Sequence, residues 1–202
     1  MSGNVVIEQP SVSDGAAMWR LARDSGSLDL NPPYTYLLCC HQFHDTSIVA
    51  RFDGEVVGFL TGFREQRSPE TVFFWQLAVD DSQRGTGLAR TMVDTLTTRV
   101  AEQGARYITL SVTPDNHASN ALFRSLAERW NVQLTTSWLF EKDVFPSETT
   151  HEPEQHFRIG PFPGHRRDGR HAPRHGTIPT AAQRRTMYGP HIGGSPTGDR
   201  TE

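Results

Sequence analysis

The chain has 202 residues, 36% of them hydrophobic, and 20 Lys and Arg against 23 Asp and Glu give a net charge of −3. This suits one domain with its own core plus an appendage, and the acidic balance argues against a nucleic-acid-binding protein, which needs a clustered basic face. No apolar run approaches the roughly 18 residues that span a bilayer, and the N-terminus lacks a signal-peptide pattern, so we expect a soluble, cytoplasmic protein with no membrane partner.

The first half of the chain alternates apolar runs with turn signals. The paired prolines Pro32 and Pro33 delay a helix until after residue 33, which puts Asp29 and Tyr34 on a stiff connector. The dipeptide Asp53-Gly54 between two β-branched runs is a strong hairpin signal. In chain order we expect a strand at 5–9, a helix from Ser13 or Asp14 to about 23, a helix from 34 to about 43, and strands at 46–52, 55–63 and 71–79.

The second half predicts a helix, a strand, another helix and a terminal pair of strands. The expected ranges are a helix from about 88 that stops near Gly104, a strand at 106–112, a helix at 117–129, and strands at 132–136 and 138–144. The polar segment 151–159 keeps a few apolar anchors, so we expect it to pack on the body. This order fits an α+β fold with a mixed, mostly antiparallel sheet flanked by helices.

From Gly160 onward the composition changes to Gly, Pro, Arg, His, Ser and Thr with hardly an aliphatic residue. Such a segment cannot bury enough apolar surface to offset the entropy lost on ordering. We therefore expect one domain at 1–159 and a disordered tail at 160–202.

The loop between the strand at 71–79 and the next helix is the clearest functional signal. Unpaired backbone N–H groups of a first helical turn, together with the helix dipole, favour an anion such as phosphate at this place. The loop has no Gly-Lys-Ser/Thr, and Arg90 stands where a dinucleotide fingerprint needs a third small residue. What remains is the pattern Arg84-x-x-Gly87-x-Ala89.

That pattern resembles the pyrophosphate loop of GCN5-related N-acetyltransferases, which bind acetyl-coenzyme A, and Asn116 matches the second cofactor-contacting motif of that superfamily. Within it, the span from Val5 to Ile159 is similar to the L-2,4-diaminobutyrate acetyltransferases of ectoine biosynthesis. The segments that carry this resemblance are Ser27 to Tyr36 (SLDLNPPYTY), Phe74 to Val79 (FWQLAV), Gln83 to Ala89 (QRGTGLA) and His151 to Arg158 (HEPEQHFR).

The resemblance implies transfer of an acetyl group from acetyl-CoA to the 4-amino group of L-2,4-diaminobutyrate. Backbone N–H groups of the loop would hold the pyrophosphate, Leu77 and Val79 would pair with the pantetheine amides at a splay between two strands, and Asn116 and Ser119 would bind further along the coenzyme. The expected cofactor-binding set is Leu77, Val79, Arg84, Gly85, Thr86, Gly87, Leu88, Ala89, Asn116 and Ser119. A backbone N–H near the splay could also stabilise the tetrahedral oxyanion.

The resemblance further implies an acceptor pocket formed by Asp29, Tyr34, Trp75, His151 and Glu154. The carboxylates would accept from the ammonium groups, Trp75 would offer a cation–π face, and Tyr34 would donate to the substrate carboxylate. The proton of the attacking amine could go to Glu154, His151, Asp29 or a water relayed by Tyr34. Many superfamily members carry a tyrosine seven residues after the motif asparagine to protonate the thiolate, and here Phe123 stands there.

Two further features of the sequence are less specific signals. Cys40 and His44 are spaced as helical neighbours, but no further ligands at zinc spacing accompany them, so we expect no metal. Cys39 and Cys40 are expected to be reduced core or interface residues. The apolar helix with Leu37, Leu38 and Phe43 could contribute to a homodimer. The rival functions are an acetyltransferase for another small amine or a protein N-terminus, and a non-catalytic acyl-CoA-binding regulator.

Overall fold

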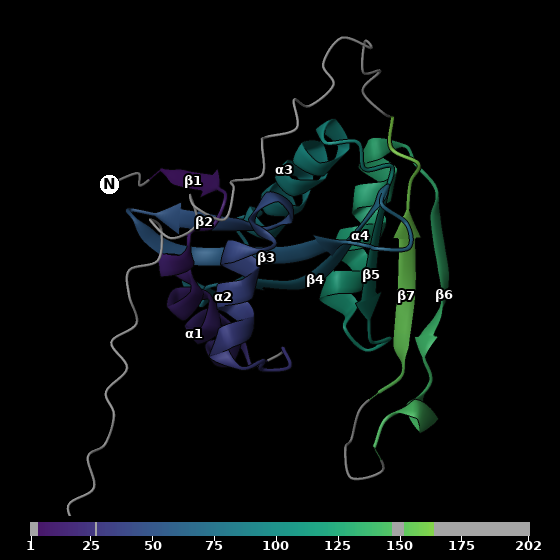
Figure 1. The fold of residues 1–202 in the computed structure, drawn as a ribbon, viewed down its shortest axis with the longest axis horizontal. Coiled ribbons are helices and arrows are strands. Elements are labelled where there is room, and N and C mark those ends of the chain that lie inside the picture. Colours follow the sequence, from purple (N-terminus) through teal and green to yellow (C-terminus); the bar gives the residue numbers. More distant parts are fainter. Residues whose placement is uncertain (1–3, 27, 147–151, 164–202) are drawn as a thin grey trace, which may run out of the picture. The chain divides into compact units, whose positions relative to one another are not determined.

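The computed structural model describes residues 4–26, 28–146 and 152–163, which all belong to one compact unit, Met1–His165. The unit combines seven strands with four α-helices (Figure 1). In chain order the elements are β1 (Val5–Glu8), α1 (Gly15–Ser25), α2 (Pro33–His41), β2 (Ile48–Phe52), β3 (Glu55–Arg64), β4 (Thr71–Val79), α3 (Leu88–Glu102), β5 (Tyr107–Val112), α4 (His117–Trp130), β6 (Leu134–Phe140) and β7 (Glu154–Ile159).

The strands form one sheet in the order β1-β2-β3-β4-β5-β7-β6. All neighbours are antiparallel except β4 and β5, which are parallel and are connected through α3. This confirms the expected mixed, mostly antiparallel sheet.

The helices cover both faces of the sheet, with α1 and α2 on one face and α3 and α4 on the other (Figure 1). On the first face Met18 and Tyr36 pack against Phe59 of β3. On the second face the core is larger and includes Met92, Leu96, Ile108, Leu126 and Phe157. Burial of these apolar side chains on two faces is what holds the sheet between its helices.

Local sequence signals explain several element boundaries. Asp14 and Ser11 form a reciprocal capping box before α1, in which the Ser11 N–H donates to Asp14 Oδ2 at 2.8 Å. Asp53 and Gly54 have φ of 50° and 89°, the left-handed pair that a tight hairpin between β2 and β3 requires. The Asn116 side chain accepts from the Ser119 N–H at 3.0 Å and caps α4.

The terminal strands differ from the expectation of two strands at 132–136 and 138–144. One strand, β6, runs through Leu134–Phe140, because the β-branched Thr135 and Thr136 and the aromatic Trp138 on either side of Ser137 favour a continuous strand over a turn. The partner of β6 is β7, which inserts between β5 and β6 and leaves Phe157 and Ile159 buried. The segment expected only to pack on the body is therefore a central strand.

The packed body reaches Phe162, three residues beyond the boundary expected at Ile159. The Phe162 side chain is 2% exposed, its ring packs edge-on against Trp130, and its N–H donates to the Arg106 carbonyl at 2.7 Å. The rest of the expected tail, residues 164–202, lies outside the described residues.

Both cysteines lie in the core of the protein. Cys39 and Cys40 are buried, and neither forms a disulfide. Burial raises the pKa of Cys39 to about 11 and that of Cys40 to about 12, so both thiols stay protonated and unreactive near neutral pH. Among the described helices, none combines the length and the apolar character needed to cross a membrane.

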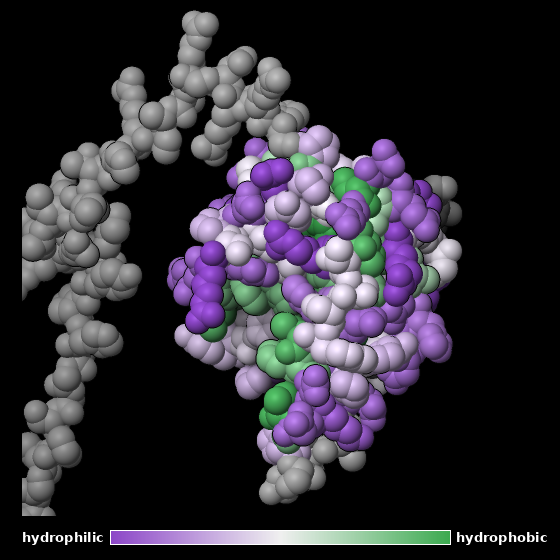
Figure 2. All heavy atoms as spheres, turned by 90° about the vertical axis from the view of Figure 1, so that its right-hand side faces the viewer, coloured by the Kyte–Doolittle hydropathy of each residue, from purple (hydrophilic) through white to green (hydrophobic). Residues whose placement is uncertain are grey.

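The edge strand β6 carries large apolar side chains at the surface. Trp138 is 53% exposed and Phe140 is 49% exposed, and Val144 follows them in the next turn. Figure 2 faces the side of the molecule that carries β6 and β7, and hydrophobic residues reach the surface there between hydrophilic ones.

Candidate functional site

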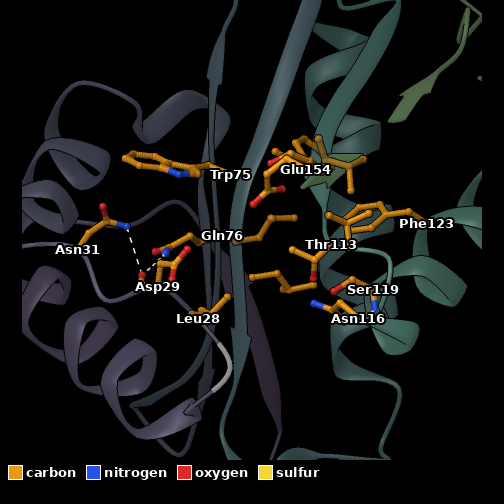
Figure 3. A pocket seen from close by; sticks show the side chains of 16 residues that line it. Leu28, Asp29, Asn31, Trp75, Gln76, Thr113, Asn116, Ser119, Phe123 and Glu154 are labelled. Carbon is orange, nitrogen blue, oxygen red and sulfur yellow. Dashed lines mark hydrogen bonds between the residues drawn. The ribbon is translucent and has the colours of Figure 1, made fainter. Parts of the chain in front are cut away.

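The parallel strands β4 and β5 separate after their first three residues. Their pairing covers Thr71 to Phe73 opposite Tyr107 to Thr109 and then stops. A cavity of about 300 Å³ lies where they separate (Figure 3). Its lining consists of Leu28, Asp29, Asn31, Leu60, Phe74, Trp75, Gln76, Leu77, Leu110, Ser111, Val112, Thr113, Asn116, Ser119, Phe123 and Glu154.

Six of the expected binding or catalytic residues line this cavity: Asp29, Trp75, Leu77, Asn116, Ser119 and Glu154. They come from four parts of the chain. Asp29 belongs to the segment between α1 and α2, Trp75 and Leu77 to β4, Asn116 and Ser119 to the start of α4, and Glu154 to β7. Figure 3 shows Asp29 and Asn31 on one side of β4 and Thr113, Asn116, Ser119 and Phe123 on the other.

Other expected residues lie elsewhere. Tyr34, in the first turn of α2, is 67% exposed and does not line the cavity. Val79 lies at the far end of β4, and His151 falls outside the described residues.

Asn31, Gln76 and Thr113 line the cavity but were not singled out from the sequence. Asn31 and Gln76 do fall within two of the four segments that carry the family resemblance, so the signal that could have found them was their place in those segments.

A bulge in β4 determines how its side chains meet the cavity. Thr61 of β3 lies opposite Gln76, but the next residue, Gly62, lies opposite Phe74, so Trp75 is an extra residue on β4. A side chain at Gly62 would come within 2.7 Å of the Phe73 carbonyl, which explains the glycine. Trp75 is 39% exposed and packs edge-on against the Phe63 ring.

The backbone of β4 offers hydrogen-bond groups to the space that β5 vacates. The Gln76 N–H donates to Thr61 Oγ1 and the Asp80 N–H donates to the Val57 carbonyl, so both point toward β3. Because N–H groups alternate between the two edges of a strand, those of Leu77 and Val79 point toward the opposite, open edge.

The glycine loop before α3 is open to solvent at its two critical positions. Gly85 and Gly87 have φ of 75° and 85°, and nothing lies within 4 Å of where a Cβ would be. The loop uses two backbone N–H groups internally, those of Arg84 and Thr86, which donate to the Asp81 and Gln83 carbonyls. The donors that can converge on an anion are therefore those of Gly85, Gly87, Leu88 and Ala89.

Charge in and around the cavity comes mainly from two carboxylates, Asp29 and Glu154. His156, two residues along β7 from Glu154, is half-buried, and this burial lowers its pKa below the ordinary value although Glu65 opposes the shift. His156 is therefore neutral near pH 7. The Phe123 ring, which carries no hydroxyl, is buried at the cavity wall.

The possible metal ligands do not come together. Cys40 is buried against Met18, with the two sulfur atoms 3.4 Å apart, whereas His44 is exposed. Within residues 4–26, 28–146 and 152–163, no three His, Cys, Asp or Glu side chains are grouped as a metal site would need.

Comparison with known proteins identifies relatives over most of the chain. The acetyltransferase (GNAT) family matches residues 16–127. An L-2,4-diaminobutyric acid acetyltransferase from Streptomyces anulatus is 50% identical over 158 residues, which are 77% of this chain and 89% of that protein. The enzyme of the same name from Marinococcus halophilus is 43% identical, over 79% of this chain and 91% of that protein.

Solved structures agree with these relatives. The diaminobutyrate acetyltransferase EctA from Paenibacillus lautus, in complex with L-2,4-diaminobutyric acid and coenzyme A, is 43% identical with a TM-score of 0.77, over 81% of this chain and 99% of that one. Ard1 from Thermoplasma volcanium, 19% identical with a TM-score of 0.61 over 77% of this chain and 97% of that one, shares the fold. The chain belongs to the GNAT acetyltransferases and, within them, to the L-2,4-diaminobutyric acid acetyltransferase family.

Proposed function

We propose that the chain transfers an acetyl group from acetyl-CoA to the 4-amino group of L-2,4-diaminobutyrate and so produces N4-acetyl-L-2,4-diaminobutyrate, the precursor of ectoine. The observation that carries the proposal is the cavity at the parting of β4 and β5, which has carboxylates for a cationic acceptor and lies beside strand edges for a coenzyme. The 43% identity to an enzyme described in complex with diaminobutyric acid and coenzyme A supports it.

On the coenzyme side, the N–H groups of Gly85, Gly87, Leu88 and Ala89 bind the pyrophosphate at the start of α3. The pantetheine arm lies along the open edge of β4 and pairs with Leu77 and Val79 as a further strand would. Asn116 and Ser119 at the start of α4 bind another part of the coenzyme. This assignment keeps the expected cofactor set, except that the N–H groups of Arg84 and Thr86 serve the loop itself.

On the acceptor side, Asp29 accepts from an ammonium group of diaminobutyrate and Trp75 presents its ring to the cation. Glu154, across the cavity, accepts the proton of the attacking amine. An alkyl ammonium has a pKa of about 10 and no lone pair while protonated, so this proton must leave before attack. Tyr34 and His151 stay proposals that rest on the family resemblance alone.

The reaction proceeds by direct attack in a ternary complex. The deprotonated amine attacks the thioester carbonyl, and a backbone N–H at the open edge of β4 stabilises the tetrahedral oxyanion. Collapse breaks the carbon–sulfur bond, releases the coenzyme thiolate and leaves the nitrogen with one proton more than the amide keeps, which passes to the thiolate or to water. Since Phe123 cannot donate a proton, the thiolate, whose pKa is about 8.5, leaves unprotonated or takes the proton from Glu154 or water.

We further propose that the enzyme works as a homodimer in the cytoplasm. The expected residues around α2 make a poor interface, because Leu38 and Phe43 are half-buried, Phe43 against the core under α1 and α2, and only Leu37 is exposed. The exposed Trp138, Phe140 and Val144 at the β6 edge make a better one, since large apolar groups on an unpaired edge strand favour association. Sedimentation of wild type against Trp138→Ser tests this, and a monomeric wild type contradicts it.

A comparison of acceptors tests the function itself. Purified protein is incubated with acetyl-CoA and either diaminobutyrate, ornithine or lysine, and free thiol release and product mass are followed. We expect acetylated diaminobutyrate to form with the highest kcat/KM. Acetylation of another amine in preference to diaminobutyrate would favour the broader acetyltransferase reading. Tight acetyl-CoA binding without any product between pH 7 and 9 would favour a regulator.

A further inference from the structure

Gln76 connects the wall of the cavity to a buried tyrosine of α2 that the cavity does not reach. We infer that Gln76 is a positioning residue, whose side-chain amide, fixed by Tyr36, holds the backbone of Asp29 at the place where the acceptor amine binds. The inference rests on the proposed function, because it concerns how the proposed acceptor pocket keeps its shape.

Two hydrogen bonds carry the inference. Gln76 Nε2 donates to the backbone carbonyl of Asp29 at 2.7 Å, and Gln76 Oε1 accepts from the Tyr36 hydroxyl at 3.0 Å (Figure 3 shows the first). A backbone carbonyl can only accept, so the nitrogen end of the amide must face Asp29. The oxygen end then faces Tyr36, whose hydroxyl is the donor. The two partners together leave one orientation for the amide.

Burial makes this chain of contacts rigid. Gln76 is 7% exposed and Tyr36 is 1% exposed, and the Tyr36 ring packs edge-on against Phe59 with 5.8 Å between ring centroids. Burial also raises the pKa of the Tyr36 hydroxyl, although hydrogen bonds with Asn31 oppose the shift, so the hydroxyl keeps its proton and stays a donor over the working pH range. A buried amide that loses a partner is costly, which favours the arrangement in which both ends are bonded.

The segment that carries Asp29 needs such an anchor. Residues 28–32 belong to neither a helix nor a strand, and Pro32 has no N–H to contribute. The Asp29 carbonyl also accepts a longer, 3.5 Å hydrogen bond from Asn31 Nδ2 within the same segment. The contact from Gln76 differs because it comes from the sheet, and so it fixes the segment relative to β4 and Trp75.

The extra residue in β4 explains why a glutamine can do this. The Gln76 N–H donates to Thr61 Oγ1 next to the bulge, so the backbone of Gln76 is itself bonded to β3. Strand residues normally alternate between the two faces of a sheet, but the extra residue interrupts this alternation, and Figure 3 shows Trp75 and Gln76 on the same side of β4 as Asp29. One strand thus contributes an exposed ring beside the cavity and the anchor for the segment behind it.

Two variants separate this role from direct contact with the acceptor. Tyr36→Phe removes one hydroxyl that does not line the cavity, and Gln76→Leu removes the amide. We expect each variant to raise the KM for diaminobutyrate by about three- to tenfold, which is the effect of losing one or two hydrogen bonds. The KM for acetyl-CoA and kcat should stay nearly unchanged. Because the Tyr36 hydroxyl also interacts with Asn31 of the same segment, the double variant should be at least as impaired as either single variant.

Thr46→Val is the matched control. Thr46 is also buried, and its hydroxyl donates to the Gly62 carbonyl at 2.7 Å, so it too connects a loop after α2 to β3, but neither Thr46 nor Gly62 lines the cavity. We expect it to lower the denaturation midpoint without moving either KM.

The kinetic constants decide between the outcomes. An unchanged KM for diaminobutyrate in folded Tyr36→Phe would overturn the inference, and so would equal increases in both KM values, which a general loosening of the fold would produce. If Gln76→Leu fails to fold, Tyr36→Phe alone decides. Absence of acetylated diaminobutyrate from the wild type would overturn the proposed function and the inference with it, whereas an active wild type with an unmoved Tyr36→Phe overturns only the inference.

Discussion

Two carboxylates at the cavity have different surroundings, which suggests different roles. Asp29 lies in an irregular segment whose backbone is bonded to Gln76, and so it can present its side chain to a bound cation. Glu154 begins β7 and lies across the cavity, near Phe123, on the side where a coenzyme sulfur would arrive. Because Phe123 offers no proton, a group that takes a proton from the amine can also return it to the thiolate.

Replacement of Glu154 tests this assignment. Glu154→Gln keeps the size and hydrogen-bonding ability of the side chain but cannot accept a proton, so we expect kcat to fall by about 10²- to 10⁴-fold, the usual contribution of a general base. The KM for acetyl-CoA should change little. Steady-state kinetics from pH 6 to 9 measures both.

The control for Glu154 is two residues away. Glu152 is exposed, and its Oε1 lies 3.6 Å from Lys142 Nζ. Glu152→Gln therefore removes a carboxylate of the same segment outside the cavity and should leave kcat unchanged. If Glu154→Gln kept wild-type kcat, the proton would have to go to Asp29, to His151 or to water.

At the scale of the elements, short-range signals were predictable from the sequence and long-range pairings were not. The Asp53-Gly54 hairpin and the glycine loop each depend on a few adjacent residues with special backbone angles, and both occur where the sequence indicates them. The sequence did not predict β7 because this strand inserts between β5 and β6, and its pairing with β5 spans the whole of α4 and β6. The alternation in Gln155 to Ile159, with Phe157 and Ile159 buried, was the available signal.

The same limit applies to the candidate site. Trp75 and Asn116 belong to recognisable segments and could be singled out from the sequence. Gln76 acts instead through its hydrogen bond to the Asp29 carbonyl, and Asp29 lies 47 residues away in the sequence. Such contacts depend on how α1 and α2 pack on the sheet, and no local sequence pattern predicts that packing.

The glycine loop allows a test with an internal control. Gly87→Glu places bulk and negative charge where the pyrophosphate would bind, so we expect coenzyme A affinity to fall below detection in calorimetry. Gly54 has a nearly equal φ, 89° against 85°, and equally open surroundings. Gly54→Glu should therefore cost similar backbone strain and leave the affinity unchanged. Equal affinity in both variants would contradict the assignment of the loop.

The junction of β1, β2 and α1 predicts a dependence of stability on pH. Asp14 is buried, which by itself raises its pKa, but hydrogen bonds from Ser11 and from Arg51, at 2.8 Å to Nη2, outweigh burial and lower it below the ordinary value. Because the pKa of Asp14 is lower in the native state than in the unfolded state, its carboxylate stabilises the fold fully above the unfolded-state pKa of about 3.9. This stabilisation is lost progressively as the pH falls through the pKa of the native state.

Asp14→Asn should therefore lower the free energy of unfolding at pH 7, by about 1–3 kcal/mol, and the deficit should shrink below pH 4. Urea unfolding from pH 3 to 7 measures it. Asp24 is the control, because its ion pair with Arg23 is exposed and Asp24→Asn should behave as wild type throughout. A deficit for Asp14→Asn that is constant with pH would show that the carboxylate charge is not the cause.

For the whole molecule, the sheet is held from two sides by separate cores, and the site lies between them. The core under α1 and α2 fixes β3 and the N-terminal part of the pocket, whereas the core under α3 and α4 fixes β5 and β7. Because β4 and β5 pair over only three positions, a gap opens between them, and members of the larger core, among them Phe74, Leu110 and Phe123, line it. An open sheet of this kind provides a binding cavity where its strands diverge.

The extent of the folded domain is the remaining test at this scale. We propose that residues 164–202 are dispensable, because their composition cannot build a core, and that the domain ends after Phe162 rather than at Ile159. A chain that ends at Pro163 should keep the denaturation midpoint and the acetyl-transfer rate of the full chain.

A chain that ends at Ile159 loses the Phe162 ring and the hydrogen bond from its N–H to the Arg106 carbonyl. Its free energy of unfolding should fall by about 3–5 kcal/mol, as it does when a buried Phe is changed to Ala. Phe162→Ala in the full chain should reproduce most of that loss, and a folded but inactive chain ending at Pro163 would show that the last residues contribute to catalysis.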